Sequence, residues 1–190
     1  MSKKVKVTAP RTLGKAIQIA LNDLALVERD KNFSVDMETC WLESRKRYDW
    51  ETTQTCEVCF AGTVMAKTHA YQERALKRDG FSISPNDFPT AWRKVFNAID
   101  SIRKYNIVEA LYDFYDEETA AKKFTTLLQS MPVVVERPDR AWNDDEENNL
   151  VELDLDIRKF FGNVHTYNSK PAAFKNNMRK LARLFIKLGV

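Results

Sequence analysis

The chain has 190 residues, of which 44% are hydrophobic and 30% charged, so it can bury a core of its own in one domain. Its three cysteines, an odd and small number, and its polar first residues without an apolar leader indicate a reducing cytoplasm rather than secretion. No stretch approaches the roughly 18 consecutive apolar residues that span a bilayer, which disfavours a membrane protein.

The first half of the chain predicts a helix, a strand and a second helix. Apolar residues recur at helical spacing over 12–29, after Thr12 as N-cap. Apolar and polar residues alternate over 33–41, which predicts a strand with one buried face and Cys40 on the other face. The cysteine box predicts a small-residue helix that includes Val58, Ala61 and Met65 and runs to about residue 76, which would place Cys56 and Cys59 on one helix face.

The second half predicts three further helices, then a hairpin and a last helix. A turn at 85–90 starts the first of the three, and breaks near residues 105–106 and 131–132 delimit the others. Residues 132–136 and 151–158 read as two strands that pair across the acidic segment 137–149. The last helix begins at Pro171 and stops at Gly189.

These elements predict an α+β fold that is predominantly helical, with about six helices and a small antiparallel sheet. With few glycines and prolines, no repeat and no low-complexity tract, residues 1–190 read as a single domain. Residues 137–149 are expected to form an acidic surface loop of that domain.

The spacing of two cysteines, Cys56 and Cys59, leaves several chemistries open. The stretch resembles the nucleophile region of papain-like proteases, where a glutamine precedes Cys-x-x-Cys-aromatic-Ala at a helix start that lowers the thiol pKa. That resemblance implies Cys59 as nucleophile and His165 as base. It also implies supporting roles for Gln54 in the oxyanion hole and for Asn168 or Asn163 in orienting the base.

Two other interpretations of the same cysteines compete with a hydrolase. Cys40, Cys56, Cys59 and His69 supply four ligand types suited to a tetrahedral zinc site, although His69 lies about 15 Å further along a helix. The two cysteines could also form a redox pair. The simplest interpretation is that they are small buried packing residues beside Ala61 and Gly62, in which case no metal and no cofactor is expected.

Charge is distributed in two adjacent and opposite blocks. Residues 136–156 hold nine acids against two arginines, a net of −7, whereas residues 159–190 hold seven Lys or Arg and no acid, a net of +7. Within the basic block, four cations stand at strict i, i+4 spacing: Lys175, Arg179, Arg183 and Lys187. Like charges at this spacing repel unless an anion lies against them. Within the chain, the acids at 144–147 are expected to face the row; outside it, the anion would be a nucleic-acid phosphate or an acidic partner. The row is therefore a candidate binding site, with Trp142 as an exposed anchor.

Several segments together resemble a group of small tailed-bacteriophage proteins with no assigned activity. They are Trp50, the box Cys-x-Val-Cys-x-Ala-Gly-x-Val-Met-Ala at 56–66, the segment Ala-Ile-Asp-Ser-Ile-Arg at 98–103, and the closing helix from Pro171 to Gly189. The resemblance implies expression in the cytoplasm of an infected bacterium. It also implies an accessory role in host takeover or against host defence.

The sequence therefore favours a phage accessory protein that binds and inhibits or redirects a host or defence protein, and is not an enzyme. A cysteine-dependent hydrolase using Cys59 is one alternative. A nucleic-acid-associated protein that uses the basic C-terminal helix is another. The sequence leaves the target and the oligomeric state open.

Overall fold

The computed structural model describes residues 8–38, 42–45, 55–67, 82–83, 88–130, 133–136, 152–155 and 161–190. Its helices are α1 (Leu13–Val27), α2 (Phe60–Ala66), α3 (Thr90–Arg103), α4 (Ile107–Phe114), α5 (Glu117–Leu128) and α7 (Pro171–Leu188). Its strands are β1 (Phe33–Val35), β2 (Leu42–Arg45), β3 (Thr55–Val58), β4 (Ser82–Ile83), β5 (Val133–Glu136) and β6 (Glu152–Leu155). Helices dominate the described residues, as the sequence predicts.

Local side-chain chemistry sets where these helices begin and end. Thr12, Asn106 and Asp116 each accept a hydrogen bond from a backbone N–H in the first turn of α1, α4 and α5, respectively. Proline occupies the first position of α7, where its missing N–H costs nothing. Gly189 ends α7 in the left-handed conformation, with φ of 69°, which favours glycine.

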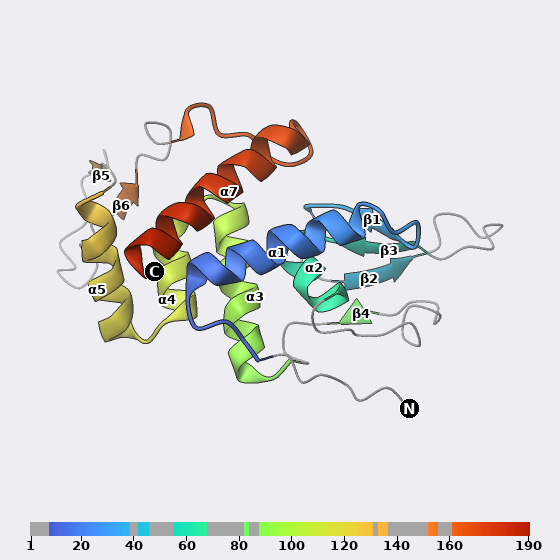
Figure 1. Ribbon diagram of the computed structural model, residues 1–190, viewed down its shortest axis with the longest axis horizontal. Coiled ribbons are helices and arrows are strands. Elements are labelled where there is room, and N and C mark those ends of the chain that lie inside the picture. The colour runs from blue at the N-terminus through green and yellow to red at the C-terminus, as the bar shows by residue number, and fades with distance from the viewer. Residues whose placement is uncertain are drawn as a thin grey trace, which may run out of the picture.

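The core forms where α1 lies between α7, α2 and α3 (Figure 1). Leu13, Ile17 and Leu24 of α1 are fully buried. They meet the buried face of α7, made of Phe174, Met178, Leu181 and Phe185. At its first turn α7 is fixed by an edge-to-face ring contact between Phe60 and Phe174, whose centroids lie 5.4 Å apart.

The closest approach of α1 and α7 occurs at Gly14. A Cβ at this position would lie 2.8 Å from the backbone nitrogen of Ile186 and 2.9 Å from the Cβ of Phe185, both closer than real Cβ contacts. The Gly14 N–H also donates to the carbonyl of Val190 at 3.1 Å. Glycine is therefore required here by the distance between the two helices.

The prediction of a small antiparallel sheet is wrong for the larger of two sheets. This sheet has the order β1-β3-β2-β4 at one end of the molecule, and β1 runs parallel to β3, with Phe33 opposite Cys56 (Figure 1). Only the β2–β3 and β2–β4 pairs are antiparallel. The alternation over 33–41 also overstates β1, because the strand ends at Val35 and the Asp36 side chain accepts from the Glu38 N–H to form a turn.

The second sheet agrees with the predicted hairpin partners. β5 and β6 pair antiparallel, with Val133 opposite Leu155 and Glu136 opposite Glu152. The acidic segment 137–149 between them, including Trp142, lies outside the described residues. Among the helices that the structure describes, none is both long and apolar enough to cross a membrane.

Candidate functional site

The cysteine box does not form the single long helix that its pattern predicts. Cys56 lies in strand β3, and Cys59 is the N-cap of α2, a helix of seven residues ending at Ala66. The two cysteines therefore do not share a helix face. Residues 68–76, over which the helix was expected to continue, are outside the described part of the chain.

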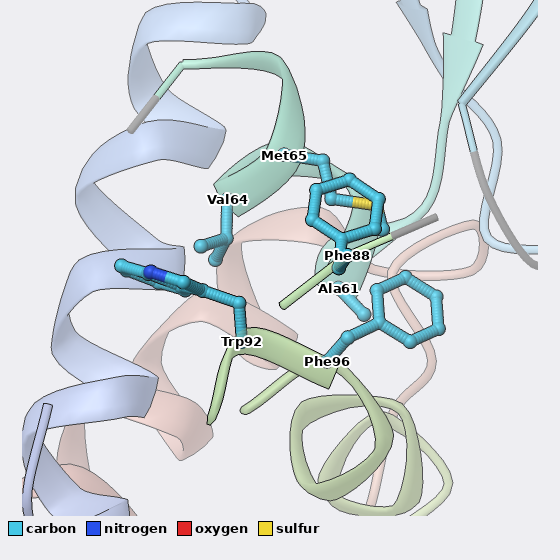
Figure 2. Close-up of a pocket in the computed structure, with 6 residues that line it drawn as sticks. All are labelled: Ala61, Val64, Met65, Phe88, Trp92 and Phe96. Carbon is cyan, nitrogen blue, oxygen red and sulfur yellow. The ribbon is translucent and has the colours of Figure 1, made fainter. Parts of the chain in front are cut away.

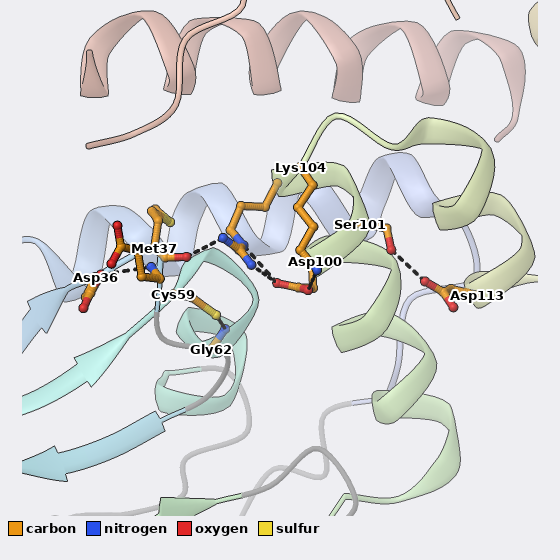
Figure 3. A network of polar contacts seen from close by, with 10 residues as sticks. Asp36, Met37, Cys59, Gly62, Asp100, Ser101, Lys104 and Asp113 are labelled. Carbon is orange, nitrogen blue, oxygen red and sulfur yellow. Dashed lines mark hydrogen bonds and ion pairs between the residues drawn. The ribbon is translucent and has the colours of Figure 1, made fainter. Parts of the chain in front are cut away.

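Cys59 is fully buried and serves as a helix cap (Figure 3). Its Sγ accepts a hydrogen bond from the Gly62 N–H at 3.3 Å, which satisfies one of the free donors of the first turn of α2. Burial raises the pKa of the Cys59 thiol to about 11, and this effect outweighs the hydrogen bond from Gly62. A nucleophilic cysteine needs the opposite shift, so this environment favours a neutral structural thiol.

The other residues implied by the protease resemblance are not assembled around Cys59 by any described contact. His165 is partly buried in the segment before α7, and its backbone carbonyl accepts a hydrogen bond from the Tyr105 hydroxyl at 2.9 Å. Asn163 and Asn168 are exposed. Gln54 lies outside the described residues.

The predicted zinc ligands are only partly described. Cys40 and His69 fall outside the described residues, and the side chain of Cys56 is likewise not described. Within the portion of the chain that is described, no group of three or more His, Cys, Asp or Glu is placed to hold a metal ion. The four-ligand zinc site thus stays a prediction.

One apolar cleft lies between α2 and the start of α3 (Figure 2). Its cavity volume is about 10 Å³, and its lining consists of Ala61, Val64, Met65, Phe88, Trp92 and Phe96. Drug-sized ligands usually occupy pockets of roughly 300–1,000 Å³ with a few polar groups to orient them. This cleft is smaller, and its lining side chains carry almost no polar atoms, so it does not resemble a cofactor site.

A polar network joins α3 to the sheet end of the molecule (Figure 3). Arg103 donates to the backbone carbonyl of Met37 and pairs with Asp100 at 2.7 Å, while Lys104 contacts the other carboxylate oxygen at 2.8 Å. Ser101 donates to Asp113 at 2.8 Å and so ties α3 to α4. Each of these groups has a protein partner, which marks the network as structural.

The basic row lies on α7 as its spacing predicts, but its first member is already paired. Lys175 donates to both carboxylate oxygens of Glu28, at 2.8 and 3.0 Å. The Tyr167 hydroxyl donates to the same carboxylate at 2.7 Å. Burial alone raises the pKa of Glu28, but the hydrogen bonds from Lys175 and Tyr167 and the nearby charge of Arg179 outweigh it and lower the pKa.

The remaining cations of the row point to solvent. Arg179, Arg183 and Lys187 are exposed, as is Lys180 beside them, and α7 carries no acidic residue. Among the residues that the structure describes, no acid forms an ion pair with any of these four. The acids at 144–147, expected from sequence to face the row, lie outside the described residues.

Sequence reasoning missed Glu28 and Tyr167 as neighbours of the row. Glu28 lies at the end of α1, 147 residues before Lys175, and no local pattern links the two. The only available signal was that α1 and α7 both have strongly apolar faces, which makes their packing plausible but does not fix which ends meet.

No family model, curated protein or solved structure matches this chain. The functional argument therefore depends on the chemistry of the described residues. That chemistry gives a buried, neutral cysteine, a small apolar cleft and a helix with an exposed cationic face.

Proposed function

We propose that this chain is a binding protein, an accessory protein of a tailed bacteriophage that engages an acidic surface of a host or defence protein through α7 and thereby inhibits or redirects it. The observation that carries the proposal is the exposed row Arg179, Arg183 and Lys187 on a helix without acids. Like charges one helical turn apart repel each other by a few tenths of a kcal/mol per pair. A negatively charged partner removes that cost, and electrostatic complementarity of this kind also speeds association.

Two further features support binding rather than catalysis. The Cys59 thiol is buried and its pKa is raised, which disfavours a nucleophile. The opposite face of α7 is anchored by fully buried Phe174, Met178, Leu181 and Phe185, so the row is held on a rigid support. Preorganised surfaces lose less conformational entropy on binding.

The test is capture of partners from bacterial lysate by the immobilised full chain, analysed by mass spectrometry. The comparison uses two variants with the same change in charge. Arg179→Glu/Arg183→Glu reverses the row, whereas Lys94→Glu/Lys122→Glu reverses exposed lysines on α3 and α5. We expect a protein that is captured by the wild type and the control variant and is lost with the row variant.

The same experiment distinguishes the nucleic-acid alternative. A nuclease-treated lysate should still yield the protein partner, and the retained material should contain no nucleic acid. Capture that disappears on nuclease treatment would favour the alternative, in which the row binds phosphates and the affinity falls steeply with salt. Equal capture by all three proteins would contradict a role for the row.

A further inference from the structure

We infer that the partner segment recognised by α7 is an acidic α-helix whose carboxylates repeat at i, i+4 and i+8, an inference that rests on the proposed function. The available surface is an arc of α7 that covers about 120° at 3.6 residues per turn. From Asn176 onwards, the arc holds six exposed residues: Asn176, Arg179, Lys180, Arg183, Ile186 and Lys187. Arg183 lies at its centre, and Ile186 lies at the edge next to α1.

The register of the surface begins at Arg179. Lys175 starts the i, i+4 row but is already paired with Glu28, so it is not free to bind a partner. Arg179, Arg183 and Lys187 then follow one another by a single helical turn and extend over about 12 Å along α7. This length corresponds to two turns of a second helix laid alongside, which presents its own i, i+4 and i+8 side chains on one face.

Glu28 shows how a carboxylate binds beside α7 in this protein. It is held at the C-terminal end of one helix, α1, and accepts two hydrogen bonds from Lys175 of another. Helix-borne carboxylates can therefore reach the cations of α7 from a neighbouring helix. A partner helix would repeat at Arg179, Arg183 and Lys187 the contact that α1 makes at Lys175.

Ile186 favours a protein partner over a phosphate backbone. Its side chain is 43% exposed and lies three residues after Arg183, on the same side of α7. Covering an exposed isoleucine stabilises a complex when the partner brings apolar atoms to it, as the centre of a protein interface does. A phosphate backbone satisfies the arginines but offers Ile186 no such contact.

The surface is also fixed in position relative to α1. The backbone nitrogen of Ile186 packs against Gly14, so α7 cannot move towards α1 at this point. Val190, just beyond α7, accepts a hydrogen bond from the Gly14 N–H. The apolar residue and the three cations therefore keep a constant spacing, which is what recognition of a regular helical repeat requires.

The experiment measures binding of fluorescent peptides to the full chain by anisotropy. The probe is an Ala-rich helical peptide of about 16 residues with Glu at every fourth residue and one Leu beside the row. A control peptide has the same composition with Glu at every fifth residue, which spreads the charges around the helix. A single-stranded and a double-stranded DNA oligonucleotide serve as phosphate probes.

We expect the fourth-residue peptide to bind at least about fivefold more tightly than the fifth-residue peptide, since only the first can pair with three cations at once. Arg179→Glu/Arg183→Glu should weaken its binding about tenfold or more, while Lys94→Glu/Lys122→Glu leaves it unchanged. Ile186→Ala should weaken peptide binding about threefold or more without affecting DNA binding.

Two results would overturn the inference. Equal affinity for both peptides would mean that binding to the row depends on the total charge of the peptide and not on the spacing of its carboxylates. If either DNA probe bound more tightly than the fourth-residue peptide, and Ile186→Ala changed the affinity of no probe, the row would be a phosphate-binding site. The proposed function can survive the first result, because capture of a host protein that depends on Arg179 and Arg183 tests it separately.

Discussion

Replacing Gly14 with alanine tests whether α1 and α7 are packed as closely as the structure places them. The added Cβ would lie 2.8 Å from the Ile186 backbone nitrogen and 2.9 Å from both the Ile186 Cγ1 and the Phe185 Cβ. Ordinary contacts between such atoms are about 3.5–4.0 Å, so the helices must separate by roughly 0.5–1 Å. A backbone nitrogen within α7 cannot rotate away as the end of a side chain can.

The two energy terms of this substitution oppose each other. Overpacking costs about 1–3 kcal/mol. Alanine in a helix gains up to about 1 kcal/mol over glycine, and less than that in the first turn. The expected net effect is a loss of about 1–2 kcal/mol in the free energy of unfolding, which lowers Tm by about 3–6 °C in a chain of this size.

Urea denaturation followed by circular dichroism measures the free energy of unfolding for both the Gly14→Ala variant and a control. The control is Gln18→Ala, an exposed substitution one turn along the same helix, which should leave stability unchanged or raise it slightly. If Gly14→Ala proved as stable as the wild type or more stable, α1 and α7 could not approach as closely as described.

Three further predictions concern the cysteine, the ion pair and the row. Native Cys59 should react with a thiol reagent only on the timescale of unfolding, because it is fully buried and its pKa is raised to about 11. Because the pKa of Cys59 in the folded protein lies above the ordinary thiol value of 9.0, stability should fall as pH rises from about 9 to about 11, and less so in Cys59→Ala; equal pH profiles would contradict this. Glu28→Gln should lower the free energy of unfolding by about 1 kcal/mol at neutral pH, as measured by urea denaturation. Because the pKa of Glu28 is lowered in the folded protein, this difference between wild type and variant should shrink below about pH 4.5; a difference that stays constant with pH would count against the ion pair. Reversal at Arg179 and Arg183 should leave Tm within about 2 °C of the wild type in a thermal melt, because both side chains are exposed and neither forms an ion pair with a described acid. A large drop in Tm would mean that acids of the same chain pair with the row.

Local signals predict most of the helix boundaries. Thr12, Asp116, Pro171 and Gly189 each act through neighbouring backbone groups, so the sequence alone identifies them as caps or stops. The start of α2 was misplaced because a strand and a helix meet at Val58 and Cys59. The small apolar residues on both sides fit either structure.

Strand direction and ion-pair partners could not be predicted in the same way. The parallel pairing of β1 with β3 depends on how the chain returns after β2, which no local periodicity encodes. The partner of Lys175 was expected in the nearby acidic block, yet the described partner is Glu28 of α1. Two charge blocks that are adjacent in sequence do not have to be in contact in the fold. The contacts of α7 depend instead on which helix packs beside it.

The packing of α1 against α7 has a consequence for how the chain folds during synthesis. Glu28 and Lys175 are 147 residues apart, and a ribosome adds about 5–20 residues per second, so the face of α1 that meets α7 waits on the order of 10 s for its partner. During that interval Leu13 and Ile17 lack the helix that later covers them, although α2 and α3 emerge sooner. Contacts of such long range also slow folding, because the chain between them must first be closed into a loop. Slower translation should therefore lengthen the period in which the nascent chain is prone to aggregate.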